Sequence, residues 1–77
     1  MEKKNTIFCD IDGTIFKYRK FETYTETKPE VIPSSLEYLK EQSSLGHMIV
    51  LTTARPQYML THTIKELIEA DVPYDNL

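Results

Sequence analysis

The chain has 77 residues, of which 40% are hydrophobic and 27% are charged, a composition that is typical of one small folded domain and argues against disorder. Its net charge of -3 does not indicate nucleic acid as a partner, although a local basic patch would still allow it. The single cysteine, Cys9, rules out an internal disulfide and fits a reducing, cytoplasmic compartment, and no apolar run approaches the roughly 20 residues that cross a membrane.

The first predicted element is a strand from Thr6 to Asp10, whose near-continuous apolar residues indicate burial on both faces. The segment from 15 to 32 interleaves aromatic and charged residues, which predicts a short exposed hairpin or flap. These 18 residues are too few for a large cap domain.

A helix is expected next, because Pro33 suits the first turn of a helix and the serines that follow it could cap it. Gly46 is its expected end. The run from Met48 to Leu51 then predicts a second buried strand, which ends in the polar residues 52–55.

The second predicted helix has Leu60, Ile64, Leu67 and Ile68 at the i, i+4, i+7, i+8 spacing of one apolar face, and it extends to about Ala70. Strands that alternate with helices indicate an α/β sheet with parallel neighbours. Ligands bind such sheets beyond the carboxyl ends of the strands.

Asp10, Asp12 and Gly13 form the most informative pattern, because they follow directly on the first strand. Side chains two positions apart in a strand point the same way, so both carboxylates would leave the strand tip together, and Gly13 would let the backbone turn. Mg2+ prefers such oxygen ligands and pairs with substrate phosphate. One carboxylate could attack while the other moves protons. The alternative is a solvated turn, since Asp-Gly is a common turn dipeptide.

A second polar group, Thr53 and Arg55, follows the second strand, and this topology would bring it close to the paired carboxylates. Arg55 could contact a substrate anion or could equally brace its own loop. Lys17, Arg19 and Lys20 form a basic cluster after the carboxylates. This cluster is either a solvated loop or a means of attracting an anionic substrate.

With these motifs the chain resembles the N-terminal portion of the haloacid-dehalogenase-like (HAD) superfamily, most of whose members are Mg2+-dependent phosphatases. The first motif of that family, Asp-x-Asp-Gly-Thr after a strand, matches Asp10 to Thr14. The second, a strand that ends in Ser or Thr, matches Thr53, and the Thr-x-Arg of many members matches 53–55. The resemblance implies a Rossmann-like parallel sheet of HAD type that is incomplete, with two central strands, two helices and a short flap. Residues 1–77 would be a single HAD-like domain or the N-terminal part of one.

The resemblance also implies roles for the site residues. Asp10 would be the nucleophile, which forms an aspartyl-phosphate intermediate, and a Mg2+ ligand. Asp12 would protonate the leaving oxygen, then activate the hydrolytic water, and would hold Mg2+ through its backbone carbonyl. Thr53 would hydrogen-bond the phosphoryl group, assisted by backbone N–H groups near Ile11 and Ala54. The residues expected to bind substrate are Thr14, Ala54 and Arg55.

Two parts of the family's site have no match in the sequence, namely the charge-balancing lysine and the acidic residues after a later strand. Lys65 falls within a helix, and Asp71 and Asp75 follow a helix rather than a strand. We favour the interpretation that the chain is the N-terminal part of a longer enzyme. The alternative is a complete chain that self-associates as a homo-oligomer to cover its sheet.

The sequence therefore predicts a Mg2+-dependent phosphohydrolase that acts on a phosphorylated small molecule or a phosphate end. A sugar phosphate, a nucleotide or a polynucleotide end are all compatible with it. The alternative is a non-catalytic module that binds phosphate or Mg2+, or an inactive truncated fragment.

Overall fold

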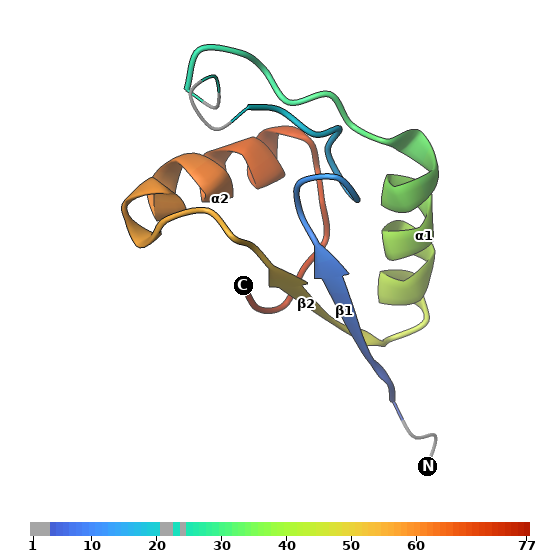
Figure 1. The fold of residues 1–77 in the computed structure, drawn as a ribbon. Coiled ribbons are helices and arrows are strands. Elements are labelled where there is room, and N and C mark those ends of the chain that lie inside the picture. Colours follow the sequence, from blue (N-terminus) through green and yellow to red (C-terminus); the bar gives the residue numbers. More distant parts are fainter. Residues whose placement is uncertain (1–3, 21–22, 24) are drawn as a thin grey trace.

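Two parallel strands form the centre of the computed structural model, which describes residues 4–20, 23 and 25–77 (Figure 1). β1 spans Thr6–Asp10 and β2 spans Met48–Thr52, which confirms both predicted strands. Their register pairs Thr6 with Met48 and Asp10 with Thr52. The carboxyl ends of both strands therefore lie side by side, each with a polar residue last.

α1 spans Pro33–Ser44 and connects the two strands. Pro33 stands in its first turn, as predicted, but the N-cap is Ile32 and no side chain caps it, so the expected serine cap is wrong. Gly46 has a φ of 86°, a left-handed conformation that glycine adopts readily, and it ends the helix as predicted.

α2 spans Leu60–Glu69 and follows a short 3-10 helix, η2, at Gln57–Met59. Its boundaries match the prediction, but its buried face differs from the predicted apolar stripe. Leu67 is buried, whereas Leu60 and Ile68 are 41% and 68% exposed. Thr63 and Glu66 are buried in their place. The helix is thus turned to bring two polar side chains inward. Neither α2 nor any other helix in the described part of the chain is long and apolar enough to cross a membrane.

One face of the strand pair is covered and the other is open. Leu39 of α1, Leu67 of α2 and Leu51 of β2 belong to a single buried cluster. On the opposite face, Phe8 is 71% exposed and Met48 is 51% exposed. The expectation that β1 is buried on both faces is therefore wrong for the described residues, because both helices contribute to the same cluster.

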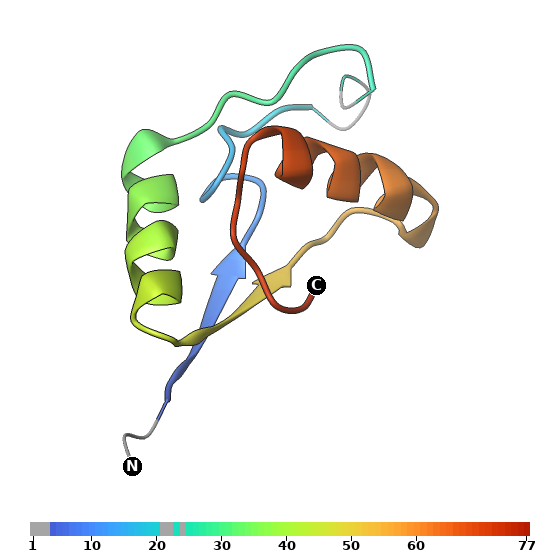
Figure 2. The ribbon, with the colours of Figure 1, turned by 180° about the vertical axis from the view of Figure 1, so that it is seen from behind.

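The flap, residues 15–32, arches over the carboxyl ends of the strands and passes α2 before it enters α1 (Figures 1 and 2). Its two limbs meet at the base, where the Lys17 N–H donates to the Glu30 carbonyl at 2.7 Å and the Ile32 N–H donates to the Ile15 carbonyl at 2.8 Å. Ile15 and Phe16, the first two residues of the flap, are fully buried. The paired limbs agree with the predicted hairpin, but its first residues are buried and not exposed as predicted, and positions 21, 22 and 24 lie outside the described residues.

The last residues run beside β2 and begin to extend the sheet (Figure 2). The Leu51 N–H donates to the Asn76 carbonyl at 2.9 Å, and Asn76 forms a parallel bridge with Val50. The Asp75 carboxylate accepts a hydrogen bond from the Ile49 N–H at 2.7 Å. Asp75 thus has a structural contact with β2, which the sequence did not predict.

Candidate active site

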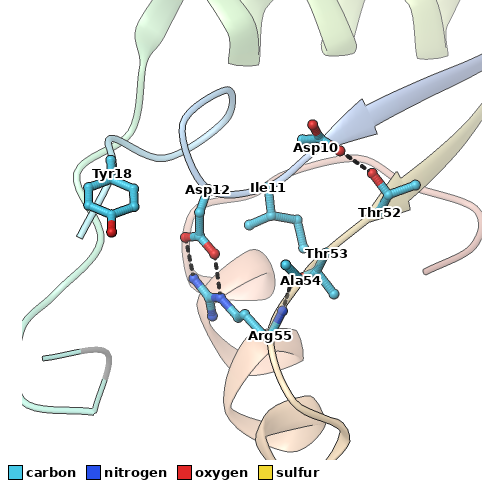
Figure 3. Close-up of a pocket in the computed structure, with 8 residues that line it drawn as sticks. All are labelled: Asp10, Ile11, Asp12, Tyr18, Thr52, Thr53, Ala54 and Arg55. Carbon is cyan, nitrogen blue, oxygen red and sulfur yellow. Dashed lines mark hydrogen bonds and ion pairs between the residues drawn. The ribbon is translucent and has the colours of Figure 1, made fainter. Parts of the chain in front are cut away.

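A pocket of about 270 Å³ opens where the two strands end (Figure 3). Three segments supply its walls: the turn after β1, the loop after β2 and the flap. The residues that line it are Asp10, Ile11, Asp12, Tyr18, Thr52, Thr53, Ala54 and Arg55. The expected meeting of the two polar groups is therefore observed. The pocket has room for a phosphoryl group with several waters, since one water takes about 30 Å³.

Asp10 lies at the tip of β1, exposed to solvent. The hydroxyl of Thr52, its partner in the strand register, donates a hydrogen bond to Asp10 Oδ1 (Figure 3). A carboxylate offers about four lone-pair positions, so this single hydroxyl leaves Asp10 able to bind further groups.

The backbone turns sharply after Asp10. Gly13 has a φ of 89°, as its predicted role in the turn requires, and its N–H donates to the Phe16 carbonyl at 2.7 Å. The Ile11 N–H donates to the Thr52 carbonyl at 3.1 Å. Because that N–H continues the strand ladder, it is engaged in the sheet rather than directed to the pocket, contrary to the assistance expected from this position.

Asp12 forms a forked ion pair with Arg55 (Figure 3). Arg55 Nε donates to Asp12 Oδ2 at 2.8 Å, and Arg55 Nη2 donates to Asp12 Oδ1 at 2.8 Å. The two side chains are 14% and 1% exposed, respectively. Forked pairs between Arg and a carboxylate fix orientation as well as distance. The Asp12 carboxylate is therefore held in one position at the wall of the pocket.

Arg55 also contacts a second acidic residue, Glu66 of α2. Its Nη1 donates to Glu66 Oε1 at 2.7 Å and to Thr63 Oγ1 at 3.2 Å. Burial opposes the charge on Arg55, but the hydrogen bonds to Asp12 and Glu66 outweigh burial and raise the pKa of the guanidinium above its usual value. Of the two interpretations of Arg55, the geometry supports bracing, with the carboxylates of Asp12 and Glu66 among its partners.

Thr53 also lines the pocket, and its hydroxyl oxygen accepts the Arg55 N–H at 3.0 Å. Since the oxygen acts as acceptor there, the hydroxyl proton remains to be donated elsewhere. Thr14 is not among the described residues that line this pocket; it lines another one with Phe8, Cys9 and residues of α1. The structure thus brings Thr53 to the carboxylates and does not bring Thr14 there.

The basic cluster that follows the carboxylates does not act as one unit. Lys17 pairs with Glu30 at 2.8 Å on the exposed flap. Arg19 instead turns inward to Glu66, at 3.0 Å, and its side chain is only 9% exposed. Arg19 therefore belongs neither to a fully solvated loop nor to a patch that attracts anions, because it forms an ion pair with the buried carboxylate of Glu66.

Sequence reasoning missed several contributors to this site, namely Tyr18, Thr52, Thr63 and Glu66. The second motif was matched to Thr53 and not to Thr52, although the strand register places Thr52 opposite Asp10. One feature of the sequence could have identified Glu66: it directly precedes Leu67 and therefore borders the apolar face of the helix. A charge in that place needs a buried partner.

The donor atoms at the pocket are compatible with Mg2+. No group of three or more His, Cys, Asp or Glu side chains that could hold a metal occurs among residues 4–20, 23 and 25–77. Mg2+ is usually held by one or two carboxylates and keeps several waters. The Asp10 carboxylate meets that description, whereas the Asp12 carboxylate is directed to Arg55, and the Asp12 backbone carbonyl stays the expected second ligand.

The fold and the pocket together define an α/β protein with an acidic site beyond parallel strands. The family model of haloacid dehalogenase-like hydrolases matches residues 7–74. The chain belongs to this family of hydrolases. Its two parallel strands and two helices form an incomplete Rossmann-like fold of that type.

One solved structure is similar over most of the chain: the conserved protein coded by a locus from Bacteroides thetaiotaomicron, with 25% sequence identity and a TM-score of 0.74. The match covers 96% of this chain and 57% of that one, so the chain spans little more than half of the solved protein's length. None of the curated proteins compared with the chain matches it.

Proposed function

We propose that the chain is a Mg2+-dependent phosphomonoesterase, or the N-terminal part of one, that works through an aspartyl-phosphate on Asp10. One observation carries this proposal: the Asp10 carboxylate, exposed at the tip of β1, shares a pocket with Asp12 and Thr53. The substrate would be a phosphorylated small molecule or a phosphate end, and sugar phosphates, nucleotides and polynucleotide ends remain the candidates.

The proposed reaction has two steps. An oxygen of Asp10 attacks phosphorus, the bond from phosphorus to the leaving oxygen breaks, and Asp12 gives that oxygen a proton. Water then attacks the phosphorus of the aspartyl-phosphate, Asp12 takes the proton, and inorganic phosphate and the Asp10 carboxylate are released. The fork from Arg55 leaves each oxygen of Asp12 a lone pair for this proton transfer.

Phosphoryl transfer needs alignment and neutralisation of charge more than it needs covalent chemistry. Thr53 would donate its hydroxyl proton to an oxygen of the transferring group, and the loop at Ala54 would approach the same group from the end of β2. Mg2+, when bound by the Asp10 carboxylate and the Asp12 carbonyl, would neutralise part of the phosphate charge. Arg55 would act by holding Asp12 rather than by touching substrate.

A second candidate is a module that binds phosphate or Mg2+ without turnover. It is favoured by the described residues that line the pocket, among which there is no lysine to balance the charges of a nucleophilic aspartate and a phosphate. Such a module would retain the metal site and lose the hydrolysis.

The decisive experiment measures hydrolysis of p-nitrophenyl phosphate by the purified chain with and without Mg2+. Asp10→Asn should abolish it and should also abolish acid-stable phosphoryl labelling of the chain. Asp71→Asn is the matched control, because Asp71 pairs only at the surface with Lys40 and has a φ of 58°, which Asn tolerates. Hydrolysis that survives Asp10→Asn would overturn the proposal, and Mg2+ binding without hydrolysis would favour the module.

The open face of the sheet bears on the partners of the chain. Phe8 and Met48 lie exposed there, so we propose that further polypeptide covers them, either a second copy of the chain or a further segment of the same fold. Sedimentation of the purified chain distinguishes a monomer from a homo-oligomer. The single cysteine supports a cytoplasmic location as part of the same proposal.

A further inference from the structure

We infer that Glu66 is a positioning residue for Asp12: it orients Arg55 from α2 and, through Arg19, ties that arrangement to the flap. The inference rests on the proposed function in one respect, because Asp12 is the proton carrier there. The contacts themselves exist without substrate and can be tested without activity.

Glu66 is the centre of a buried ionic network. Its Oε1 accepts from Arg55 Nη1 at 2.7 Å and from Arg19 Nη2 at 3.0 Å, and its Oε2 lies 3.1 Å from Arg19 Nη2. His62 Nε2 lies 3.2 Å from the same Oε2. Glu66 is only 3% exposed. A buried carboxylate is costly unless it is paired, so these contacts must be kept together.

The shape of Arg55 explains how Glu66 acts on Asp12. The guanidinium is planar and its donors point in fixed directions. Nε and Nη2 bind Asp12 on one side while Nη1 binds Glu66 on the other. Arg55 cannot rotate to weaken one contact without disturbing the other. The position of Glu66 on α2 therefore sets the orientation of the Asp12 carboxylate at the pocket.

The charges of the network require both acids. Asp12 and Glu66 alternate with Arg55 and Arg19, so each guanidinium lies beside a carboxylate. Without the charge of Glu66, two guanidinium groups would face one another across a buried space. Repulsion and lost hydrogen bonds would then pull Arg55 from its place.

Arg19 extends the network into the flap. Its Nη1 donates to the Thr27 carbonyl at 2.8 Å, so this one side chain joins the outgoing limb of the flap to the returning limb and both to α2. Tyr18, the preceding residue, lines the active-site pocket and is 76% exposed (Figure 3). Glu66 thus also determines where the flap holds Tyr18 over the pocket.

The first test uses nuclear magnetic resonance of the arginine side chains in the full chain without substrate. In the unchanged protein, the Arg55 Nε–H should give a distinct signal that exchanges slowly with water, because it is buried and bound to Asp12. Glu66→Gln should speed that exchange by about tenfold or more. Glu69→Gln, the same change at an exposed position of α2, should leave it unaltered. An unaltered Arg55 signal in folded Glu66→Gln would overturn the inference.

If Glu66→Gln does not fold, Glu66→Asp takes its place, since it keeps the negative charge but shortens the side chain by one methylene group. Arg19→Gln tests the flap separately. It should speed amide exchange at Lys17 and Ile32 by about tenfold while the Arg55 Nε–H stays protected. Unchanged exchange at these two amides would overturn the link to the flap.

Activity gives a separate measurement once the proposed hydrolysis is established. Glu66→Gln should lower kcat by about tenfold or more with little change in KM, because a misplaced proton carrier affects the reaction step rather than binding. A rise in KM with unchanged kcat would overturn the role toward Asp12. A chain without hydrolysis, by contrast, would remove the proposed function and leave the Arg55 and amide measurements to stand on their own.

Discussion

The two carboxylates of the pocket lie two positions apart and have opposite surroundings. Asp10 is exposed at a strand tip and accepts from one neutral hydroxyl, that of Thr52. Asp12 is 14% exposed and is held by both arms of a buried arginine. An aspartate that must bind incoming groups needs free lone pairs, and one that must move a proton in a fixed direction needs a fixed carboxylate. The difference in environment matches the two proposed roles.

The largest expected effect is a loss of protein stability that differs between substitutions of the two carboxylates. Asp12→Asn should lower the free energy of unfolding by about 2–4 kcal/mol, because the buried Arg55 loses an ionic partner on one side. Asp10→Asn should change it by less than about 1 kcal/mol, since Asp10 is exposed. Urea unfolding followed by circular dichroism measures both values. Equal losses would mean that the environments do not differ as described.

The next effect separates the two threonines of the pocket. Thr53→Val should lower kcat for p-nitrophenyl phosphate by about 100-fold, because it removes a donor to the transferring group. Thr52→Val should cost only about fivefold, since its hydroxyl is directed to Asp10. Thr53→Ser, which keeps the hydroxyl, is the control and should retain most activity. A larger loss at Thr52 would reverse the assignment.

A smaller effect uses Cys9 to report the charge of its neighbour. Burial raises the pKa of the Cys9 thiol, and the charge of Asp10 raises it further. A raised pKa means less thiolate at a given pH, so iodoacetamide should react with Cys9 more slowly at pH 8 than with a cysteine in a short peptide. Asp10→Asn should speed this reaction about twofold in metal-free buffer. Asp12→Asn in the folded protein should not speed it. Equal acceleration by both substitutions would contradict the assignment of this effect to the charge of Asp10.

The smallest effect is expected from the ion pair of Lys17 and Glu30 on the flap. The hydrogen bond and the charge of Lys17 lower the pKa of Glu30, so any stabilisation is present above the unfolded pKa and is lost as the pH falls through the folded one. Both side chains are largely exposed, at 61% and 74%. Lys17→Gln should therefore leave the thermal midpoint unchanged within error, whereas Arg19→Gln should lower it. A similar decrease for both would show that the buried and the exposed pairs do not differ.

The sequence predicted the elements well because their signals are local. Each strand is a short apolar run that ends in a polar residue, and Pro33 and Gly46 mark the limits of the first helix through their own backbone preferences. The convergence of Asp10, Asp12 and Thr53 followed from the parallel order of the strands. The buried side of α2 did not follow, because the apolar spacing did not show that Glu66 would have a partner.

The sequence by itself determined the family, the order of strands and helices, and the edge of the sheet at which the pocket lies. These depend on apolar periodicity and on a short motif, which the chain carries within a few residues. Only the tertiary structure decided that Arg55 braces Asp12 and that Arg19 turns inward. Those contacts join residues 43 and 47 positions apart, and the cost of burying each charge is met only when the folded chain brings its partner beside it.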